Sequence, residues 1–385
     1  MAGSHRAAPR RGFLQYVLIG ASVLAALVAV LPIAFAIFGG IGAVKNPRTA
    51  FASSPPGDYA VVARTEGNED VIAVAPLHDP ARTTEVARVA HLDGYSTNGA
   101  VSPDGKRVAL IVPNAGSQSR ASAELVVVTL ESGEQVQTSK GLDPQQTPLW
   151  DPDSGSVMVV RNDVDADGRG KLAMLKVAAD GSGEQVLKAY GGILGVYPAG
   201  FDAQARFLSV IIDGRGSTLV RDGTEVGNLS SQITRDWRVS TDGTQLAYIE
   251  SNLDGGLHYV ARVFALDGGS GMVTAQALSD GSQQLGVAWK PGAASPTVGH
   301  ERGDARSAGV MAQSLSTADS ATRDGFTTAG FDVPIAYSAD GVALAVTHWS
   351  GPSFEQAGEP SLQLLTDDAR TTITTFTRFM GWAAR

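Results

Sequence analysis

Three aspartates in one short stretch have the residue types and spacing of a calcium loop. In the stretch DVDADGRG, Asp163, Asp165 and Asp167 alternate along the chain, and a glycine follows the third. Ca²⁺ takes carboxylate and carbonyl oxygens as ligands, and alternate carboxylates followed by a glycine form the first half of an EF-hand loop. The second half departs from this pattern, because Met174 stands where a bidentate Glu is expected. Two interpretations stay open: a Ca²⁺ site at these aspartates, or a solvated acidic turn between two strands.

A second candidate residue is Trp349, which follows an apolar run in the stretch THWSGPSF. We expect it in an exposed loop, where its ring would contribute to a binding face. The six histidines lie far apart in the sequence and show no metal-ligand spacing. The sequence contains no Gly-x-Ser-x-Gly motif, no His-Glu-x-x-His motif and no phosphate-binding glycine loop. A Ser-His-Asp arrangement of distant residues stays open, but no catalytic constellation is evident.

The composition narrows the class of protein. The chain has 385 residues with 45 Gly, while aromatic residues make up 6% and charged residues 18%. Many glycines together with many short apolar runs are typical of all-β sandwiches, barrels and propellers. The chain has no Cys, which excludes disulfides, thiolate metal sites and cysteine nucleophiles. Its formal net charge is -9 and its basic residues form no stripe, so we expect no nucleic-acid partner.

The N-terminal segment has the length and apolarity of a membrane anchor. No charged residue occurs from Phe13 to Ile41, whereas a helix needs only about 20 apolar residues to cross a bilayer. The basic residues before this segment favour an N-terminus inside the cytoplasm and a C-terminal body outside it. We therefore expect a basic cytoplasmic tail at 1–12, a transmembrane anchor or signal segment at 13–41 and a linker at 42–53.

This segment leaves two locations open. An uncleaved anchor would make a single-pass protein of the cell membrane, with the C-terminal domain outside the cytoplasm. Alternatively, a signal peptidase would cut at the small-x-small site at 34–36 or at 50–52 and release the exported chain. The stretch RRGFLQ also resembles the twin-arginine export motif, although Pro9 replaces the Ser or Thr that usually precedes the arginine pair.

One short phrase recurs along the rest of the chain. SPDGKRVALIV begins at Ser102, and STDGTQLAYIE and SADGVALAVTH are near-copies. Each copy joins a tight turn containing Asp-Gly to an apolar strand, which is the pattern of a β-hairpin. With degenerate copies included, the phrase starts at seven positions, which are Ser54, Ser102, Asp151, Asp202, Ser240, Lys290 and Ser338.

A period of roughly 50 residues with four short strands per unit predicts a β-propeller with one blade per repeat. We therefore predict an all-β, seven-bladed propeller over 54–385, with six or eight blades as the fallback. The C-terminal segment supplies a strand at 376–382 that the first blade lacks, and pairing there would close the ring and protect two sheet edges. Trp150, Trp289 and Trp382 occupy equivalent repeat positions, which favours packing between blades.

The repeated pattern of an apolar residue, Ser-Pro-Asp-Gly and an apolar strand resembles the WD-like repeats of TolB-type propellers. It is also similar to the propeller part of LpqB-type envelope lipoproteins, although this chain lacks a lipid-accepting Cys. The resemblance covers roughly residues 51 to 385. It implies a non-catalytic, extracytoplasmic module that binds an envelope or membrane protein through a face of the ring. The alternative is a propeller enzyme, a hydrolase, lyase or quinone-dependent dehydrogenase, with its site in the central channel.

Overall fold

The computed structural model describes most of the chain after the N-terminal segment. The described residues are 50–114, 122–164, 170–253, 257–267, 272–274, 283–301, 315–317, 330–367 and 369–385. The chain divides into two compact units, Met1–Pro47 and Arg48–Arg385, and the first lies wholly outside the described residues, as does the anchor expected at 13–41. Among the described residues, no helix has the length and apolar character of a membrane span.

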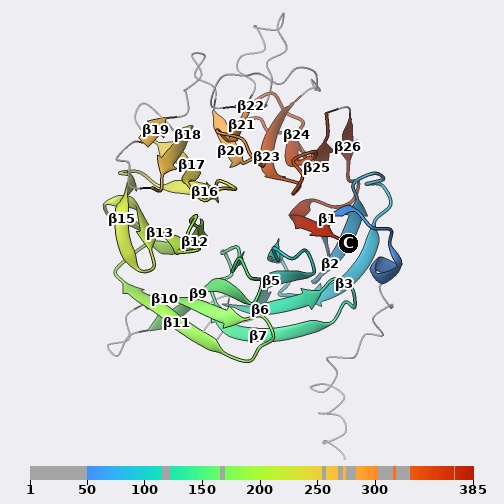
Figure 1. Cartoon of the computed structure of the whole chain (residues 1–385), viewed down its shortest axis with the longest axis horizontal. Coiled ribbons are helices and arrows are strands. Elements are labelled where there is room, and N and C mark those ends of the chain that lie inside the picture. Colours follow the sequence, from blue (N-terminus) through green and yellow to red (C-terminus); the bar gives the residue numbers. More distant parts are fainter. Residues whose placement is uncertain are drawn as a thin grey trace, which may run out of the picture. The chain divides into compact units, whose positions relative to one another are not determined.

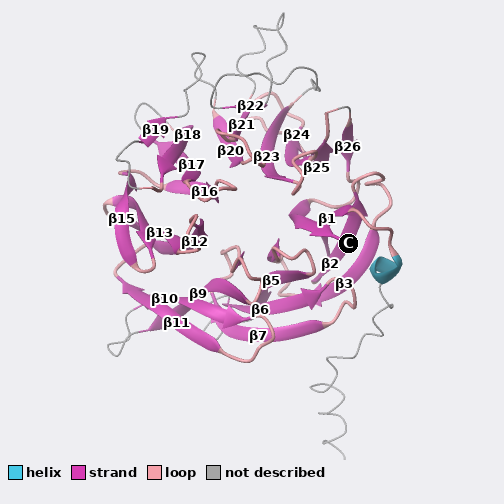
Figure 2. Ribbon diagram, in the orientation of Figure 1, coloured by secondary structure: helices cyan, strands magenta, loops and turns pink. Residues whose placement is uncertain are grey.

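The second unit is built of antiparallel strands arranged in a ring around a central opening (Figures 1 and 2). A short 3-10 helix, η1 (Ala50–Ser53), precedes the first strand. The first sheet contains, from the centre outward, β27 (Arg378–Ala384), β1 (Asp58–Glu66), β2 (Glu69–Pro76) and β3 (Thr84–Ala90). The predicted all-β propeller is therefore confirmed.

The remaining sheets follow one another along the chain, and we call each meander of successive strands a blade. One eight-stranded sheet contains two blades, β4 (Asn98–Val101), β5 (Arg107–Asn114), β6 (Ser122–Thr129) and β7 (Gln135–Leu142), then β8 (Leu149–Trp150), β9 (Ser156–Val164), β10 (Gly170–Ala178) and β11 (Glu184–Gly191). The next sheet contains β12 (Gly195–Phe201), β13 (Phe207–Asp213), β14 (Gly216–Arg221) and β15 (Thr224–Ser230). It is followed by β16 (Thr234–Val239), β17 (Gln245–Asn252), β18 (His258–Ala265) and β19 (Met272–Thr274). The last two sheets contain β20 (Gln284–Ala288), β21 (Thr297–His300) and β22 (Leu315–Thr317), and β23 (Phe331–Tyr337), β24 (Leu344–Trp349), β25 (Pro360–Leu365) and β26 (Arg370–Thr372).

The repeated phrase forms the turn between the first two strands of a blade. Ser102 Oγ donates to Asp104 Oδ1 at 2.5 Å and accepts from the backbone N–H of Arg107 at 3.0 Å. The copies that start at Ser240 and Ser338 repeat the serine-to-aspartate bond at 2.6 Å. The glycine of each turn has a φ near +70°, which favours glycine over residues with a Cβ. The sequence repeats because each of these hairpins needs the same local hydrogen bonds.

The three equivalent tryptophans bind the preceding blade. Each indole Nε1 donates to a backbone carbonyl of the neighbouring inner strand: Trp150 to Ala100 at 2.8 Å, Trp289 to Arg238 at 2.9 Å, and Trp382 to Ala336 at 3.4 Å. Trp150 and Trp289 are buried. Buried indoles need a hydrogen-bond partner, and here the partner lies across a blade junction. The predicted packing role of these tryptophans is thus confirmed.

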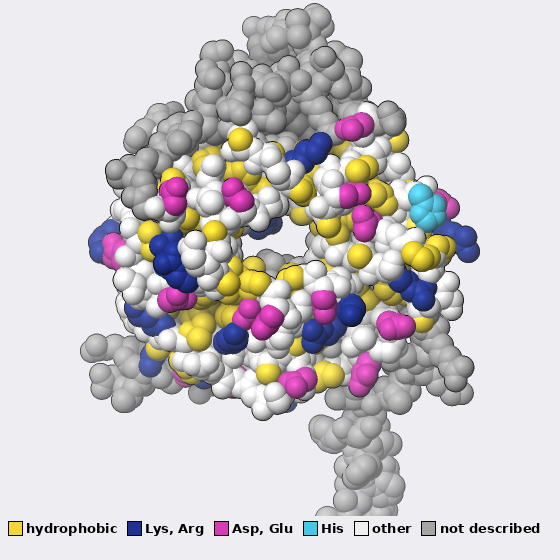
Figure 3. Space-filling view, viewed as in Figure 1, with side chains coloured by type: hydrophobic (Ala, Val, Ile, Leu, Met, Phe, Trp, Pro, Cys, Tyr) yellow, Lys and Arg dark blue, Asp and Glu magenta, His cyan; other side chains and the backbone are white. Residues whose placement is uncertain are grey.

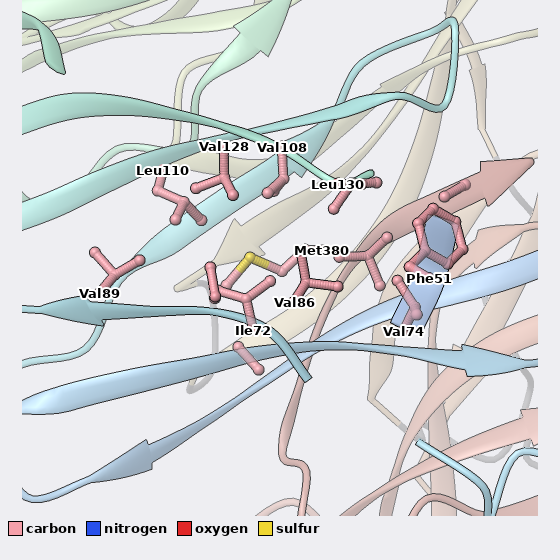
Figure 4. Packing of buried hydrophobic residues seen from close by; sticks show 14 of the residues in the cluster. Phe51, Ile72, Val74, Val86, Val89, Val108, Leu110, Val128, Leu130 and Met380 are labelled. Atoms are coloured by element: carbon pink, nitrogen blue, oxygen red, sulfur yellow. The ribbon is translucent and has the colours of Figure 1, made fainter. Parts of the chain in front are cut away.

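The two ends of the second unit meet in one sheet. β27 pairs antiparallel with β1, with Ala60 opposite Trp382, and it runs two residues later than the strand expected at 376–382. Met380 of β27 packs among aliphatic side chains of the first blade and of its neighbour, as Figure 4 shows. Phe51 of η1 is buried in the same cluster and meets the ring of Tyr59 edge to face at 5.1 Å.

Candidate binding site in the central channel

A cavity of about 470 Å³ lies where the inner strands converge. Figure 3 shows the opening at the centre of the ring. The wall draws on six innermost strands and the residues beside them. Its lining residues are Thr97, Asn98, Gly99, Ala100, Thr147, Pro148, Leu149, Pro198, Ala199, Trp237, Arg238, Ile335, Ala336, Thr347, Thr377, Arg378, Phe379, Met380 and Gly381.

The wall consists mostly of small and apolar side chains together with two arginines. Arg238 and Arg378 are its charged members, and the other members are apolar, glycine, threonine or asparagine. None of the described residues in this wall is a carboxylate, histidine, serine or lysine. The wall thus offers apolar packing surface and two guanidinium groups, one near the end of β16 and one at the start of β27.

Arg378 is already neutralised by a buried carboxylate. Its Nη1 donates to Asp70 Oδ2 at 3.0 Å and to the carbonyl of Thr97 at 2.6 Å, and its Nη2 donates to Asp70 Oδ1. Asp70 is fully buried. Burial alone would raise the pKa of Asp70, but the hydrogen bonds from Arg378, Thr65 and Thr97 lower it to about 2. This pair joins β2, β27 and the residue before β4, so its role is to hold the wall together.

Arg238 is the cation that faces the channel without a carboxylate partner among the described residues. Its side chain is exposed, and its Nη1 donates to the carbonyl of Trp237 at 3.0 Å. Trp237 stacks on Tyr197 with ring centroids 5.1 Å apart, and its Nε1 donates to Thr234 Oγ1 at 2.9 Å. An exposed guanidinium therefore stands beside an aromatic ring that the fold holds in place.

The importance of these arginines did not emerge from the sequence. Arg238 had a usable signal, because it occupies the repeat position at which other copies have Ala100 and Ala336. An arginine among small residues at an inner-strand position is unusual. Arg378 had no such signal, because its partner Asp70 lies 308 residues away in the sequence.

Exposed apolar side chains occur on the connections at one end of the ring. Successive strands are antiparallel, so the connections between second and third strands lie at the same end as those that lead into the next blade. We call this the loop end. In the described parts of these connections, the exposed large apolar side chains are Tyr95, Leu194, Ile233, Leu253, Leu257 and Phe354. They come from the connections of several different blades around the ring.

An aromatic contact at the loop end joins two blades. Phe354 meets the ring of Tyr259 edge to face at 5.3 Å, and the Arg235 guanidinium lies 4.3 Å from the centre of the Tyr259 ring. The backbone N–H of Phe354 donates to Glu301 Oε2 at 2.7 Å. Trp349, expected in an exposed loop, is the half-buried last residue of β24, and the loop that carries Phe354 begins after it.

The predicted calcium loop is only partly described. Asp163 lies in β9 opposite Lys171, and its Oδ2 is 3.8 Å from Arg161 Nη2. Asp165 and Asp167 lie outside the described residues. Within the part of the chain that the structure describes, no three acidic or histidine side chains are grouped so as to hold a metal ion. The Ca²⁺ site therefore stays a prediction.

Comparison with known proteins supports the fold. No family model and no curated protein sequence matches the chain. Prolyl oligopeptidase B from Galerina marginata is similar in structure, with a TM-score of 0.56, 12% identity, and coverage of 85% of this chain and 50% of that one. The β-propeller domain of the trilobed protease from Pyrococcus furiosus has a TM-score of 0.50 at 12% identity, covering 83% of this chain and 97% of that one. TolB from Acinetobacter baumannii has a TM-score of 0.48 at 13% identity, covering 86% and 67%.

These likenesses concern the fold alone. The chain spans half the length of the oligopeptidase, and the same fold hosts unrelated functions. The predicted resemblance to β-propeller proteins is confirmed at the level of the fold.

Proposed function

We propose that this protein is a membrane-tethered, extracytoplasmic propeller that binds a protein of the cell envelope and performs no catalysis. Its blade count is seven, with the eight-stranded sheet taken as two blades that meet at the pair of Leu142 and Arg161. The uncharged segment at 13–41 serves as the membrane anchor, and release after export is the alternative.

The observation that carries this proposal is that the neighbouring residues Arg238 and Trp237 both line the channel wall. Arginine and tryptophan are the residue types most enriched among side chains that dominate protein-protein binding energy. Here the indole is fixed by Tyr197 and Thr234, so little conformational freedom is lost when a partner binds. The exposed Ile233 of the same blade lies at the loop end, where β16 starts, whereas Arg238 lies near the other end of that strand.

The test is cross-linked affinity capture from native membranes with a tag inserted in a loop. The wild-type chain is compared with Arg238→Glu and with Arg82→Glu, a matched reversal at an exposed arginine in the connection between β2 and β3. We expect one or two envelope proteins to be recovered with the wild type and Arg82→Glu, and lost with Arg238→Glu. Equal recovery with both variants would contradict the channel site. Turnover of a sugar, lactone or peptide at enzyme-like rates would contradict the non-catalytic role.

A further inference from the structure

Two kinds of contact recur at the junctions between successive blades, and one junction has neither of them. The first is the indole hydrogen bond of Trp150, Trp289 or Trp382. The second is a turn glycine that packs on the preceding blade. A Cβ added at Gly105 would lie 2.7 Å from the backbone N of Ala384, and one at Gly243 would lie 2.3 Å from that of Ala203. Gly341 lies in the same way against Pro291, where the distance would be 3.2 Å.

The exception is the junction between the blade of β8–β11 and that of β12–β15. Phe201 occupies the tryptophan position there, and its side chain has no N–H to donate. Ala205 occupies the glycine position and still has a φ of +56°, although left-handed backbone is costly for a residue with a Cβ. Both departures fall in the degenerate phrase that begins at Asp202.

A pocket of about 280 Å³ opens at this junction. Its apolar lining comes from both blades and consists of Met158, Met174, Leu187, Tyr190, Phe201, Ala205 and Phe207. Phe201 and Phe207 meet at a centroid distance of 5.6 Å, while Met158 and Met174 are almost fully buried. Aromatic rings and methionine thioethers make favourable contacts with a flat apolar guest.

The polar groups of this pocket differ in how far they are satisfied. Lys176 Nζ is paired with Asp151 Oδ2 at 2.5 Å, and Asp222 Oδ1 accepts the backbone N–H of Phe207 at 3.0 Å. Lys188 is exposed, and its Nζ donates to the carbonyl of Gly223 and lies 5.4 Å from the Tyr190 ring centre. Among the described residues, Lys188 has no carboxylate partner. An ammonium group donates three hydrogen bonds, so Lys188 retains capacity for an anion.

We propose that this pocket binds a small aromatic acid. The ring lies between the methionines and the phenylalanines, and the carboxylate pairs with Lys188 at the rim. A pocket of this size takes a ligand of about one or two fused rings, because small-molecule sites bury most of the surface of their ligand. This site is separate from the channel and from the protein partner proposed above.

The probes are 2-naphthoate, naphthalene-2-carboxamide and 2-naphthylmethylammonium, titrated by calorimetry into the detergent-solubilised full-length chain. They share one ring system and differ in the charge of the head group. We expect 2-naphthoate to bind at a single site with a Kd of about 1 mM or tighter, ahead of the amide and the cation. Lys188→Met should weaken the naphthoate about two- to fivefold, since exposed ion pairs contribute modestly.

The decisive variant is Phe201→Trp, which restores the repeat. By analogy with Trp150 and Ala100, its indole would fill the pocket and donate to the carbonyl of Leu149. We expect a higher Tm and no naphthoate binding.

Leu187→Trp, at a rim side chain that is 39% exposed, covers the same pocket and serves as the second variant if Phe201→Trp fails to fold. Trp289→Phe is the control at another junction and should leave naphthoate binding unchanged. Absence of saturable binding, retention of binding in the filled variant, or preference for the cation would each overturn the proposal.

Discussion

The indole of Trp289 donates its Nε1 hydrogen to the backbone carbonyl of Arg238 at 2.9 Å. The bond that joins two blades therefore also holds the residue whose side chain faces the channel. The inner strand β16 therefore contributes both to stability and to the proposed binding. Its backbone accepts a hydrogen bond from the neighbouring blade, and its side chains line the channel.

Trp289→Phe should reduce the free energy of unfolding by about 1–2 kcal/mol. The substitution keeps most of the apolar contact but removes the N–H and leaves the carbonyl of Arg238 without its partner. Chemical denaturation of the variant and of Trp349→Phe provides the comparison, since Trp349 is half-buried at a strand end and its indole donates no hydrogen bond to another blade among the described residues. Equal losses in the two variants would show that the inter-blade bond adds nothing.

Gly243→Ala should destabilise the ring more than Gly67→Ala does. Both glycines have left-handed backbone, with φ of +70° and +64°, so both variants carry the cost of about 1–2 kcal/mol for a Cβ in that conformation. Only at Gly243 would the new Cβ meet the backbone of Ala203; nothing lies within 4 Å of it at Gly67. Thermal unfolding of the two purified variants measures the difference. Matching Tm values would mean that the turn at Gly243 is not closely packed against the preceding blade.

The hairpins and the ring were predictable from the sequence because their causes are local. Ser102, Asp104 and Gly105 specify one turn within four residues, and repetition of that turn fixes the period. The channel wall was not predictable in the same way. Arg238 and Arg378 line one cavity only once the ring has closed, and their separation along the chain does not indicate that they share it. Trp349 was expected in a loop, but the strand pairing of β24 extends three residues beyond Val346, where the apolar run ends.

The buried pair of Asp70 and Arg378 should make stability depend on pH in the acid range. The folded-state pKa of Asp70 is about 2, against an ordinary value of 3.8. Because the folded-state value is the lower one, the stabilising contribution is complete above about pH 4 and is lost as the pH falls through 2. The difference corresponds to about 2 kcal/mol.

The measurement is the Tm of the wild type and of Asp70→Asn between pH 2 and pH 5. Asparagine keeps the shape of the side chain and part of its hydrogen bonding but does not titrate in this range. Other carboxylates titrate equally in both proteins, so the wild type should lose stability more steeply than the variant. Parallel pH profiles would rule out a contribution from this pair.

Phe51→Ala should cost about 3–5 kcal/mol, because it removes a buried ring from the cluster that joins the first blade to its neighbour. Cleavage at the small-x-small site at 50–52 would remove the same ring. The mature chain should therefore be full-length or shortened at 34–36. Intact mass of the protein recovered from membranes decides between these states. A chain cut at 50–52 that unfolds at the wild-type temperature would contradict the structural role of Phe51.

Site-specific photo-cross-linking tests whether the channel wall at Trp237 and Arg238 binds an envelope protein. A benzophenone amino acid replaces Thr147, an exposed residue of the same wall, in one chain and Arg82 in another, and intact cells are irradiated. We expect one specific adduct of an envelope protein from position 147, lost when Arg238→Glu is added, and none from position 82. No adduct from position 147, or the same adduct from both positions, would contradict binding at the channel wall.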